Sequence, residues 1–318
     1  MVHQFVTLMS NMFWHVFLFV VSVGWIKQVI TTPGINQSIA ALVDSNSSLL
    51  TWPTHFTQGI VPKPIHSHND YWREVPMLTA ISLGVVSVEA DVWQLNGTLF
   101  VGHEEAALTP NRTFHSLYID PLVQILDMMN PKDEFTVNAT SRNGVFDIAS
   151  SIPLQLLVDM KTDGNATLPA VLQALEPLRS AGYLTTFSNN TLTTSAVTVI
   201  GTGNTPFDGI LALSPRDVFF DAPLDNLNSS TSFSPSVSPI ASTDYGAFIG
   251  WSGIGGISDA QRATILTFVN DAHSRGIKAR FWDTPGWPVR ARESVWNELL
   301  NDGADWLNAD DLVAASQF

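Results

Sequence analysis

Short apolar runs alternate with longer segments of helical periodicity from about residue 61 to the C-terminus. Runs of five to nine residues rich in Val, Ile, Leu and Phe are typical of buried strands when turn residues flank them. Eight such runs are predicted as core strands: 65–69, 85–93, 154–161, 196–203, 209–215, 247–253, 277–283 and 304–310.

Turn and cap residues set the connections between these strands. The dipeptide Asn96-Gly97 separates 85–93 from TLFVGH at 98–103, and this pair predicts a tight hairpin. Helical patterns are expected at 73–83, 168–181, 259–275 and 289–302. The last three run up to Gly182, Gly276 and Gly303, each a predicted C-terminal cap.

Eight strands with mostly helical crossovers in about 250 residues predict a (β/α)8 TIM barrel. An open doubly wound sheet is the alternative, but no G-x-G-x-x-G fingerprint follows the first strand. We therefore expect one α/β barrel domain over 61–318, with the Ser- and Pro-rich tract 225–243 as a loop after the fifth strand. Residues 31–60, rich in Thr, Ser, Asn and Pro, are expected to be a linker.

The first 30 residues differ from the rest in character. Met12–Ile26 is an apolar run followed by Lys27, long enough for a signal-peptide core and close to a membrane anchor. Glycosylation sequons support entry into the secretory pathway, and so a membrane-anchored or secreted glycoprotein that contacts the membrane through its N-terminal segment. They occur at Asn36, Asn46, Asn96, Asn111, Asn138, Asn165, Asn189 and Asn228.

The composition restricts the partners and the chemistry. A formal charge of −14 argues against nucleic acid as a partner, because phosphate backbones need a basic surface. It remains compatible with a small phosphate substrate, since a bound divalent cation reverses the local field. The chain has no cysteine, which excludes disulfides, thiolate catalysis and zinc–thiolate sites.

Polar residues gather at the ends of the first three strands, where a TIM barrel builds its active site. Residues two apart in a strand share a face, so each strand delivers a pair of polar side chains to one side. One such pair is more often a solvated strand end or a salt bridge, but three pairs at successive strand ends indicate a site. The pairs are His66 and His68, Glu89 and Asp91, and Asp159 and Lys161, and the hairpin can fold His103 over the same mouth.

These residue types suit a metal-assisted reaction. Three carboxylates and the oxygen of Asn69 make an all-oxygen site, which predicts one divalent cation, Mg²⁺ or Ca²⁺. Two histidines can supply a general acid and a general base, and a lysine adds positive charge where an oxyanion develops. His66 is expected to be a buried structural residue, Asp70 and Tyr71 to start the next helix, and Arg73 is a candidate for substrate contact.

The motifs HSHNDY (66–71), VEADVW (88–93) and VGHEEAAL (101–108) resemble those of the phospholipase C-like phosphodiesterases. That superfamily includes phosphoinositide phospholipase C, glycerophosphodiester phosphodiesterases and sphingomyelinases D, and the closest likeness is to the fungal altered inheritance of mitochondria protein 6 family. The resemblance implies catalytic roles for His68, His103 and Lys161, and metal ligation by Asn69, Glu89, Asp91 and Asp159. It also implies substrate contact by Trp282, an aromatic residue near the end of the seventh strand.

Two positions depart from the pattern of the glycerophosphodiester enzymes: Asn69 replaces an Arg, and Glu104 replaces a Gly. The resemblance therefore implies a phosphoric diester hydrolase, or a diester-cleaving lyase, acting on a lipid-derived, lysophospholipid-type or glycerol diester, without fixing the head group. Two alternatives stay open at this point. One is a glycoside hydrolase with paired carboxylates, and the other is a catalytically inactive, membrane-tethered glycoprotein with a barrel fold.

Overall fold

The computed structural model describes residues 34–318, and they fall into two compact units that divide between Trp52 and Pro53. The first unit contains α2 (Ile35–Asp44) and the 3₁₀ turn η1 (Ser48–Leu50), and no residue of α2 is buried. Both elements lie in the segment predicted as a linker. The apolar run Met12–Ile26 lies outside the described residues.

Within residues 34–318, no helix combines the length and the apolar character that crossing a bilayer requires.

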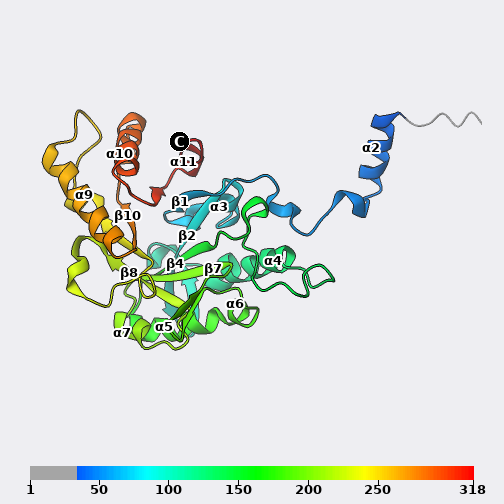
Figure 1. Cartoon of the computed structure of the whole chain (residues 1–318), viewed down its shortest axis with the longest axis horizontal. Helices are drawn as coiled ribbons and strands as arrows, with labels where there is room; N and C mark the ends of the chain where they lie inside the picture. Colours follow the sequence, from blue (N-terminus) through cyan, green and yellow to red (C-terminus); the bar gives the residue numbers. More distant parts are fainter. Residues whose placement is uncertain (1–33) are drawn as a thin grey trace, which may run out of the picture. The chain divides into compact units, whose positions relative to one another are not determined.

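The second unit is built around a parallel sheet of eight strands that closes on itself (Figure 1). The strand order is β10-β9-β8-β7-β4-β2-β1-β11, and a parallel bridge between Arg280 and Trp306 joins the two ends. This is the predicted (β/α)8 barrel. Its strands are β1 (Lys63–Ser67), β2 (Val85–Leu95), β4 (Leu154–Met160), β7 (Val197–Gly203), β8 (Val218–Pro223), β9 (Ile240–Asp244), β10 (Lys278–Trp282) and β11 (Leu307–Ala309).

The predicted hairpin is confirmed. β3 (Thr98–Val101) pairs antiparallel with the end of β2, with Val92 opposite Val101. Asn96 and Gly97 both have positive φ, 51° and 82°, as a two-residue hairpin turn requires. The turn thus returns the chain over the C-terminal end of β2 and places His103 there.

The fifth and sixth strands were predicted in the wrong places. Residues 209–215 belong largely to α7 (Phe207–Leu211) and its following turn, and the strand is β8. Residues 247–253 begin in α8 (Tyr245–Phe248) and continue as a loop, whereas β9 lies just before them, inside the tract predicted as a loop. Short apolar runs fit a helical turn as well as a strand, and the polar sequence IASTD disguises β9.

The long helices α9 (Asp259–Ser274) and α10 (Val289–Asn301) match their predictions. The glycines predicted to end three helices, 182, 276 and 303, have φ of 75°, 72° and 98°, the left-handed conformation of a C-terminal cap. The helix predicted at 168–181 is divided into α5 (Gly164–Ala174) and α6 (Glu176–Ser180). The one predicted at 73–83 is shortened to α3 (Leu78–Ser82) because Pro76 cannot donate a helical hydrogen bond.

The remaining elements complete the outer layer. A small hairpin, β5 (Thr186–Ser188) with β6 (Thr191–Thr193), precedes β7, and α11 (Leu312–Gln317) closes the chain. In the insertion 104–153, α4 (Asp120–Met129) buries Leu122, Ile125, Leu126 and Met129 in the core that includes β2 and β4. The short turns are η2 (His55–Thr57), η3 (Asp70–Trp72), η4 (Glu105–Ala107), η5 (His115–Ile119), η6 (Asp147–Ala149) and η7 (Leu224–Ser229).

A buried guanidinium lies inside the barrel. Arg280 on β10 is 3% exposed and donates from Nε to Asn308 Oδ1 (3.0 Å) and from Nη1 to Ser242 Oγ (3.4 Å). Its Nη1 also lies 4.0 Å from Asp221 Oδ2, whereas Asp221 Oδ1 is buried without a hydrogen-bond partner among the described residues. Burial raises the pKa of Asp221 to about 6, although the nearby Arg280 charge opposes the rise.

The raised pKa of Asp221 predicts a pH-dependent cost of folding. Because its folded pKa is above the unfolded value of 3.8, stability falls as pH rises from about 4 to about 7 and its carboxyl is forced to ionise. We expect Asp221→Asn to remove this slope, so that its free energy of unfolding rises by about 3 kcal/mol relative to wild type over that pH range. Urea unfolding in the presence of chelator, at several pH values, measures this difference. A difference between the two proteins that is flat with pH, or that has the opposite slope, would contradict the prediction.

The packing of α4 predicts a contrast between two of its residues. Leu126 is fully buried, whereas Met128, two positions later, is 39% exposed. We expect Leu126→Ala to lower the free energy of unfolding by about 2–5 kcal/mol through the cavity it leaves. Met128→Ala on the same helix should cost less than about 1 kcal/mol. Equal losses for the two variants in denaturant unfolding would show that α4 does not pack on the barrel as described.

Candidate active site

The polar pairs predicted at the strand ends meet because β1, β2 and β4 are neighbours in the sheet. Their parallel pairing brings the C-terminal ends of the strands to one mouth, and Asp91 pairs directly with Asp159 in the register of β2 and β4. Glu89, two residues before Asp91, shares its inward face. Sequence spacing and sheet register together therefore bring three carboxylates into one place.

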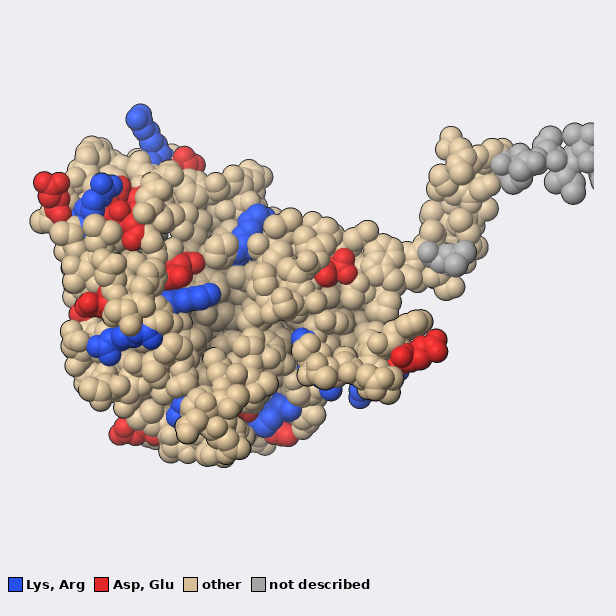
Figure 2. Space-filling view, viewed as in Figure 1, with Lys and Arg blue, Asp and Glu red and all other residues tan. Residues whose placement is uncertain are grey.

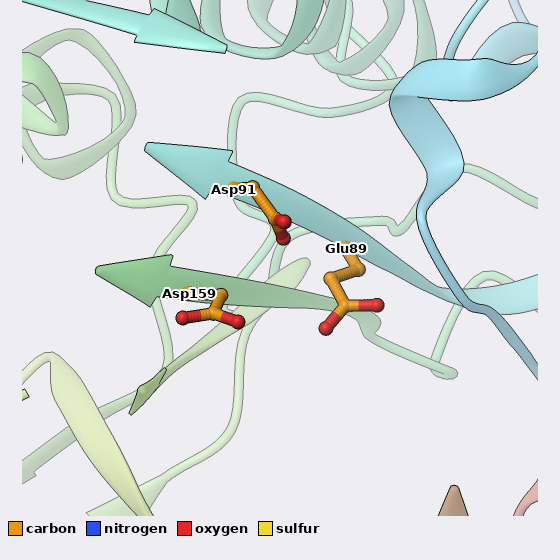
Figure 3. Close-up of side chains that lie close together, drawn as sticks. All are labelled: Glu89, Asp91 and Asp159. Atoms are coloured by element: carbon orange, nitrogen blue, oxygen red, sulfur yellow. The ribbon is translucent and has the colours of Figure 1, made fainter. Parts of the chain in front are cut away.

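Figure 3 shows Glu89 and Asp91 on one strand and Asp159 on its neighbour, with their carboxylates in a common space. One oxygen from each lies within 4.8 Å of the others. Glu89 is 5% exposed and Asp91 1% exposed, and Asp91 Oδ1 is buried without a hydrogen-bond partner among the described residues. An orphaned carboxylate oxygen in an all-oxygen cluster fits a hard divalent cation such as Mg²⁺ or Ca²⁺.

The electrostatics of the cluster also favour a cation. Burial, together with the charges of Glu89 and Asp159, raises the pKa of Asp91 to about 6, against the opposing effect of Lys161. Burial likewise raises the pKa of Asp159. Additional positive charge would stabilise the ionised form of both carboxyls.

Lys161 lies inside this cluster. Its Nζ is 2.7 Å from Asp159 Oδ2 and 3.0 Å from Asp91 Oδ2, and its side chain is 23% exposed. Burial alone would lower the pKa of Lys161, but the two carboxylates outweigh it and raise the pKa. An ammonium has three N–H donors, so one remains for a group that enters the mouth.

Asn69 lies two residues after β1, in the left-handed conformation with φ of 49°, and directly precedes η3. This turn points its backbone N–H at Glu89 Oε2 (2.9 Å), and its side-chain Oδ1 lies against the Tyr71 hydroxyl. Asn69 is therefore next to the carboxylates, where the sequence placed it. Its role as a metal ligand stays a prediction.

Tyr71 is a site residue that sequence reasoning missed. Its hydroxyl lies 2.6 Å from Asp91 Oδ2 and 3.1 Å from His103 Nδ1, and burial raises its pKa, which keeps it neutral. The expectation that Asp70 starts the next helix agrees with the structure. Its carboxylate accepts a hydrogen bond from the backbone N–H of Met77 (2.6 Å) at the start of α3. A hydroxyl two residues beyond Asn69 was the available signal for Tyr71.

The two predicted catalytic histidines each lie beside a carboxylate. His103 Nδ1 is 3.3 Å from Asp91 Oδ2, and its ring contacts Trp72 at a centroid distance of 5.4 Å. His68 Nδ1 is 2.9 Å from Oδ1 of Asp310, a residue that follows β11 and was not singled out in the sequence. A neutral imidazole that donates from Nδ1 to a carboxylate presents Nε2 as a base.

The two predicted substrate contacts differ. Arg73 donates from Nη2 to the carbonyl of His68 (2.8 Å) and lies 3.5 Å from that of Ala309, so here its guanidinium holds the ends of β1 and β11 together. Trp282 ends β10 two residues after the inward-facing Arg280 and is 37% exposed. Because residues two apart in a strand share a face, Trp282 faces the mouth. Substrate binding by either residue stays a prediction.

His66 is fully buried, as expected. Burial lowers its pKa to about 3, and the charge of Arg280 adds to the effect, so the imidazole is neutral. Burial alone would raise the pKa of Glu89, but the hydrogen bond with His66 and the charge of Arg280 outweigh it and lower the pKa. Glu89 is therefore an anion beside a neutral histidine.

Comparison with known proteins places the chain. The model of a family described as an AIM6-like phosphodiesterase domain matches residues 54–221. The altered inheritance of mitochondria protein 6 homolog of Arthroderma benhamiae is 44% identical over 282 residues, covering 86% of this chain and 88% of the relative. Altered inheritance of mitochondria protein 6 of Saccharomyces cerevisiae is 34% identical over 285 residues, covering 81% of this chain and 71% of the relative.

Among solved structures, a glycerophosphodiester phosphodiesterase from Parabacteroides distasonis matches with a TM-score of 0.45 and 12% identity, over 81% of this chain and 97% of that one. The two sequence relatives are far more similar in sequence and cover 86% and 81% of this chain. The chain therefore belongs to the altered inheritance of mitochondria protein 6 family and carries its AIM6-like phosphodiesterase domain.

Proposed function

We propose that this protein is a divalent-cation-dependent phosphodiesterase that cleaves a lipid-derived or glycerol phosphodiester by histidine acid–base catalysis. The observation that carries the proposal is the position of two carboxylate-paired imidazoles beside a buried cluster of three carboxylates and a lysine. Glu89, Asp91, Asp159 and Asn69 would hold the cation, Mg²⁺ or Ca²⁺. When bound, it would supply positive charge to the phosphoryl oxygens.

The protein's own residues would then move the protons. One of His68 and His103 removes a proton from the attacking water or substrate hydroxyl at Nε2, and the other protonates the leaving oxygen. Lys161 directs its third N–H to a phosphoryl oxygen. Attack by water gives hydrolysis, whereas attack by a neighbouring hydroxyl of the substrate gives a cyclic phosphate.

The partners of the two histidines favour an assignment of these roles. Asp310 pairs with His68 alone among the described histidines. Asp91 divides its charge among His103, Lys161 and the Tyr71 hydroxyl. We therefore assign the base to His68, whose carboxylate partner is not shared with Lys161, and the acid to His103.

The alternatives predicted from the sequence receive less support. A glycosidase separates its two carboxyls by about 5–9.5 Å to leave room for the sugar and water, whereas oxygens of these three carboxylates lie within 4.8 Å and Lys161 joins two of them. An inactive glycoprotein has no need to gather buried acids around an orphaned oxygen.

We extend the proposal to the location of the protein. A secretory route, either as a membrane-anchored or as a secreted glycoprotein, is supported by the exposure of every sequon asparagine, from Asn36 to Asn228. Exposure is what an oligosaccharide acceptor requires. The membrane contact through the N-terminal segment is likewise part of the proposal, and it makes a lysophospholipid-type substrate reasonable.

Cation binding predicts a specific stability response. We expect Mg²⁺, Mn²⁺ or Ca²⁺ to raise the melting temperature of the wild type. At a cation concentration one hundred times the dissociation constant, the folded state should gain about 2.7 kcal/mol. Asp91→Asn should melt higher than wild type in chelator, because it relieves repulsion within the cluster, and should lose the response to cation. Differential scanning fluorimetry measures the shift in melting temperature. An equal shift on adding cation in Asp91→Asn and wild type would refute the site.

The histidine roles predict a second result. His68→Asn and His103→Asn keep an amide near the position of Nδ1 but delete Nε2, so turnover should fall by about 10²–10⁴-fold while the fold is retained. The control is His273→Asn, whose ring pairs with Asp305 at the other end of the barrel. The assay measures phosphate-ester release from glycerophosphodiesters, lysophospholipids and inositol phospholipids, with cation or chelator. No turnover of any of them, or full activity in both variants, would overturn the proposal.

A further inference from the structure

A chain of buried hydrogen bonds runs beneath the carboxylate cluster. Gln155 Nε2 on β4 donates to Ser87 Oγ on β2 (2.7 Å), and Ser87 Oγ lies 2.7 Å from Nδ1 of His66 on β1. On the other side of the ring, His66 Nε2 lies 3.5 Å from Glu89 Oε2. His66 and Ser87 are fully buried, and Gln155 is 6% exposed. The chain thus crosses three neighbouring strands and ends on a candidate metal ligand.

The direction of this chain follows from the donor capacity of its members. An amide nitrogen donates only, so the oxygen of Ser87 is the acceptor toward Gln155 and its one hydrogen is free for His66. Among the hydrogen bonds of the described residues, Nδ1 of His66 is the acceptor within reach of this hydrogen, so we infer that Nδ1 accepts it. Because a buried neutral imidazole carries a single hydrogen, that hydrogen is on Nε2 and points to Glu89.

Glu89 Oε2 is consequently committed to two donors, the backbone N–H of Asn69 (2.9 Å) and the imidazole of His66. Within the described residues, hydrogen bonds reach Oε2 and leave Oε1 free. A carboxylate fixed through one oxygen presents the other in a defined direction, and this is how supporting residues orient metal ligands.

We propose that His66 is a positioning residue for the metal site. The Gln155–Ser87 pair selects its Nε2–H tautomer, and that N–H holds Glu89 so that Oε1 faces the cation. The inference rests on the proposed function only in requiring that the carboxylate cluster binds a cation. It assigns to His66 a task that burial alone does not explain, since an apolar side chain would otherwise fill the same space at lower cost.

Two substitutions separate the two sides of the ring. His66→Gln can place an amide nitrogen near the position of Nε2 and keep a donor to Glu89. His66→Asn places its amide near the position of Nδ1, so it keeps the Ser87 contact and loses the donor to Glu89. The control for loss of buried hydrogen bonds is Thr57→Val, since Thr57 is 1% exposed and bonds the backbone of Val145 and Asp147 instead.

The test is isothermal titration of the full chain and its variants with Mn²⁺ and Mg²⁺, with melting temperatures measured in chelator. We expect His66→Asn to weaken cation binding by about 10–100-fold, as loss of a supporting residue does elsewhere. His66→Gln should stay closer to wild type, and Thr57→Val should bind as wild type does even where its melting temperature falls. Equal affinity in His66→Asn and wild type would overturn the role of His66 and leave the proposed function standing. A wild type that binds neither cation would overturn both.

The tautomer has a test that needs no cation. In the ¹⁵N spectrum of the imidazole of His66, we expect a protonated Nε2 and an unprotonated Nδ1. Ser87→Ala should remove the donor to Nδ1 and weaken this preference. A protonated Nδ1 in the wild type would leave Nε2 without a hydrogen to donate to Glu89 and would refute the inference.

Discussion

The burial of three carboxylates in one mouth of the barrel is the constraint around which the rest of the site is arranged. Ionised acids this close repel one another, and the interior solvates them poorly, so each requires positive charge or donated hydrogen bonds. Lys161 supplies charge to Asp91 and Asp159, and Arg280 supplies it from within the barrel. Even so, the pKa of Asp91 remains raised to about 6, which is the signature of a site short of positive charge.

A backbone N–H and a neutral hydroxyl add to the stabilisation of the carboxylates by the Lys161 and Arg280 side chains. The left-handed turn at Asn69 points an N–H at Glu89, and the Tyr71 hydroxyl lies against Asp91. Each of these contacts depends on register, because a slip of one residue would turn the inward side chains of a strand outward. The cluster therefore forms because Asp91 and Asp159 are paired in the register of β2 and β4. The electrostatic interactions among the carboxylates follow from that pairing.

Those parts of the fold and site that follow a local period were predictable from the sequence. The E-x-D of β2 and the D-x-K that ends β4 needed only the two-residue repeat of a strand, and Asn96-Gly97 needed only turn chemistry. The fifth and sixth strands failed because their apolar content is no greater than that of the helical turns beside them. Asp310 could not be paired with His68 in advance, since 242 residues separate them and only closure of the barrel brings β11 beside β1.

A net charge of −14 repels an anion at long range, but the field that a bound substrate meets is local. Charges on the surface are screened within about 8–10 Å at ordinary salt, whereas the buried groups at the mouth are screened much less. On the face seen in Figure 2, basic and acidic side chains are interspersed and do not gather into one area of either sign. A phosphodiester that reaches the mouth would therefore respond chiefly to Lys161, to the two imidazoles and to any cation held by the carboxylates. An acidic protein can in this way bind a small anion and still repel a long polyanion, for which the surface charge counts along its whole length.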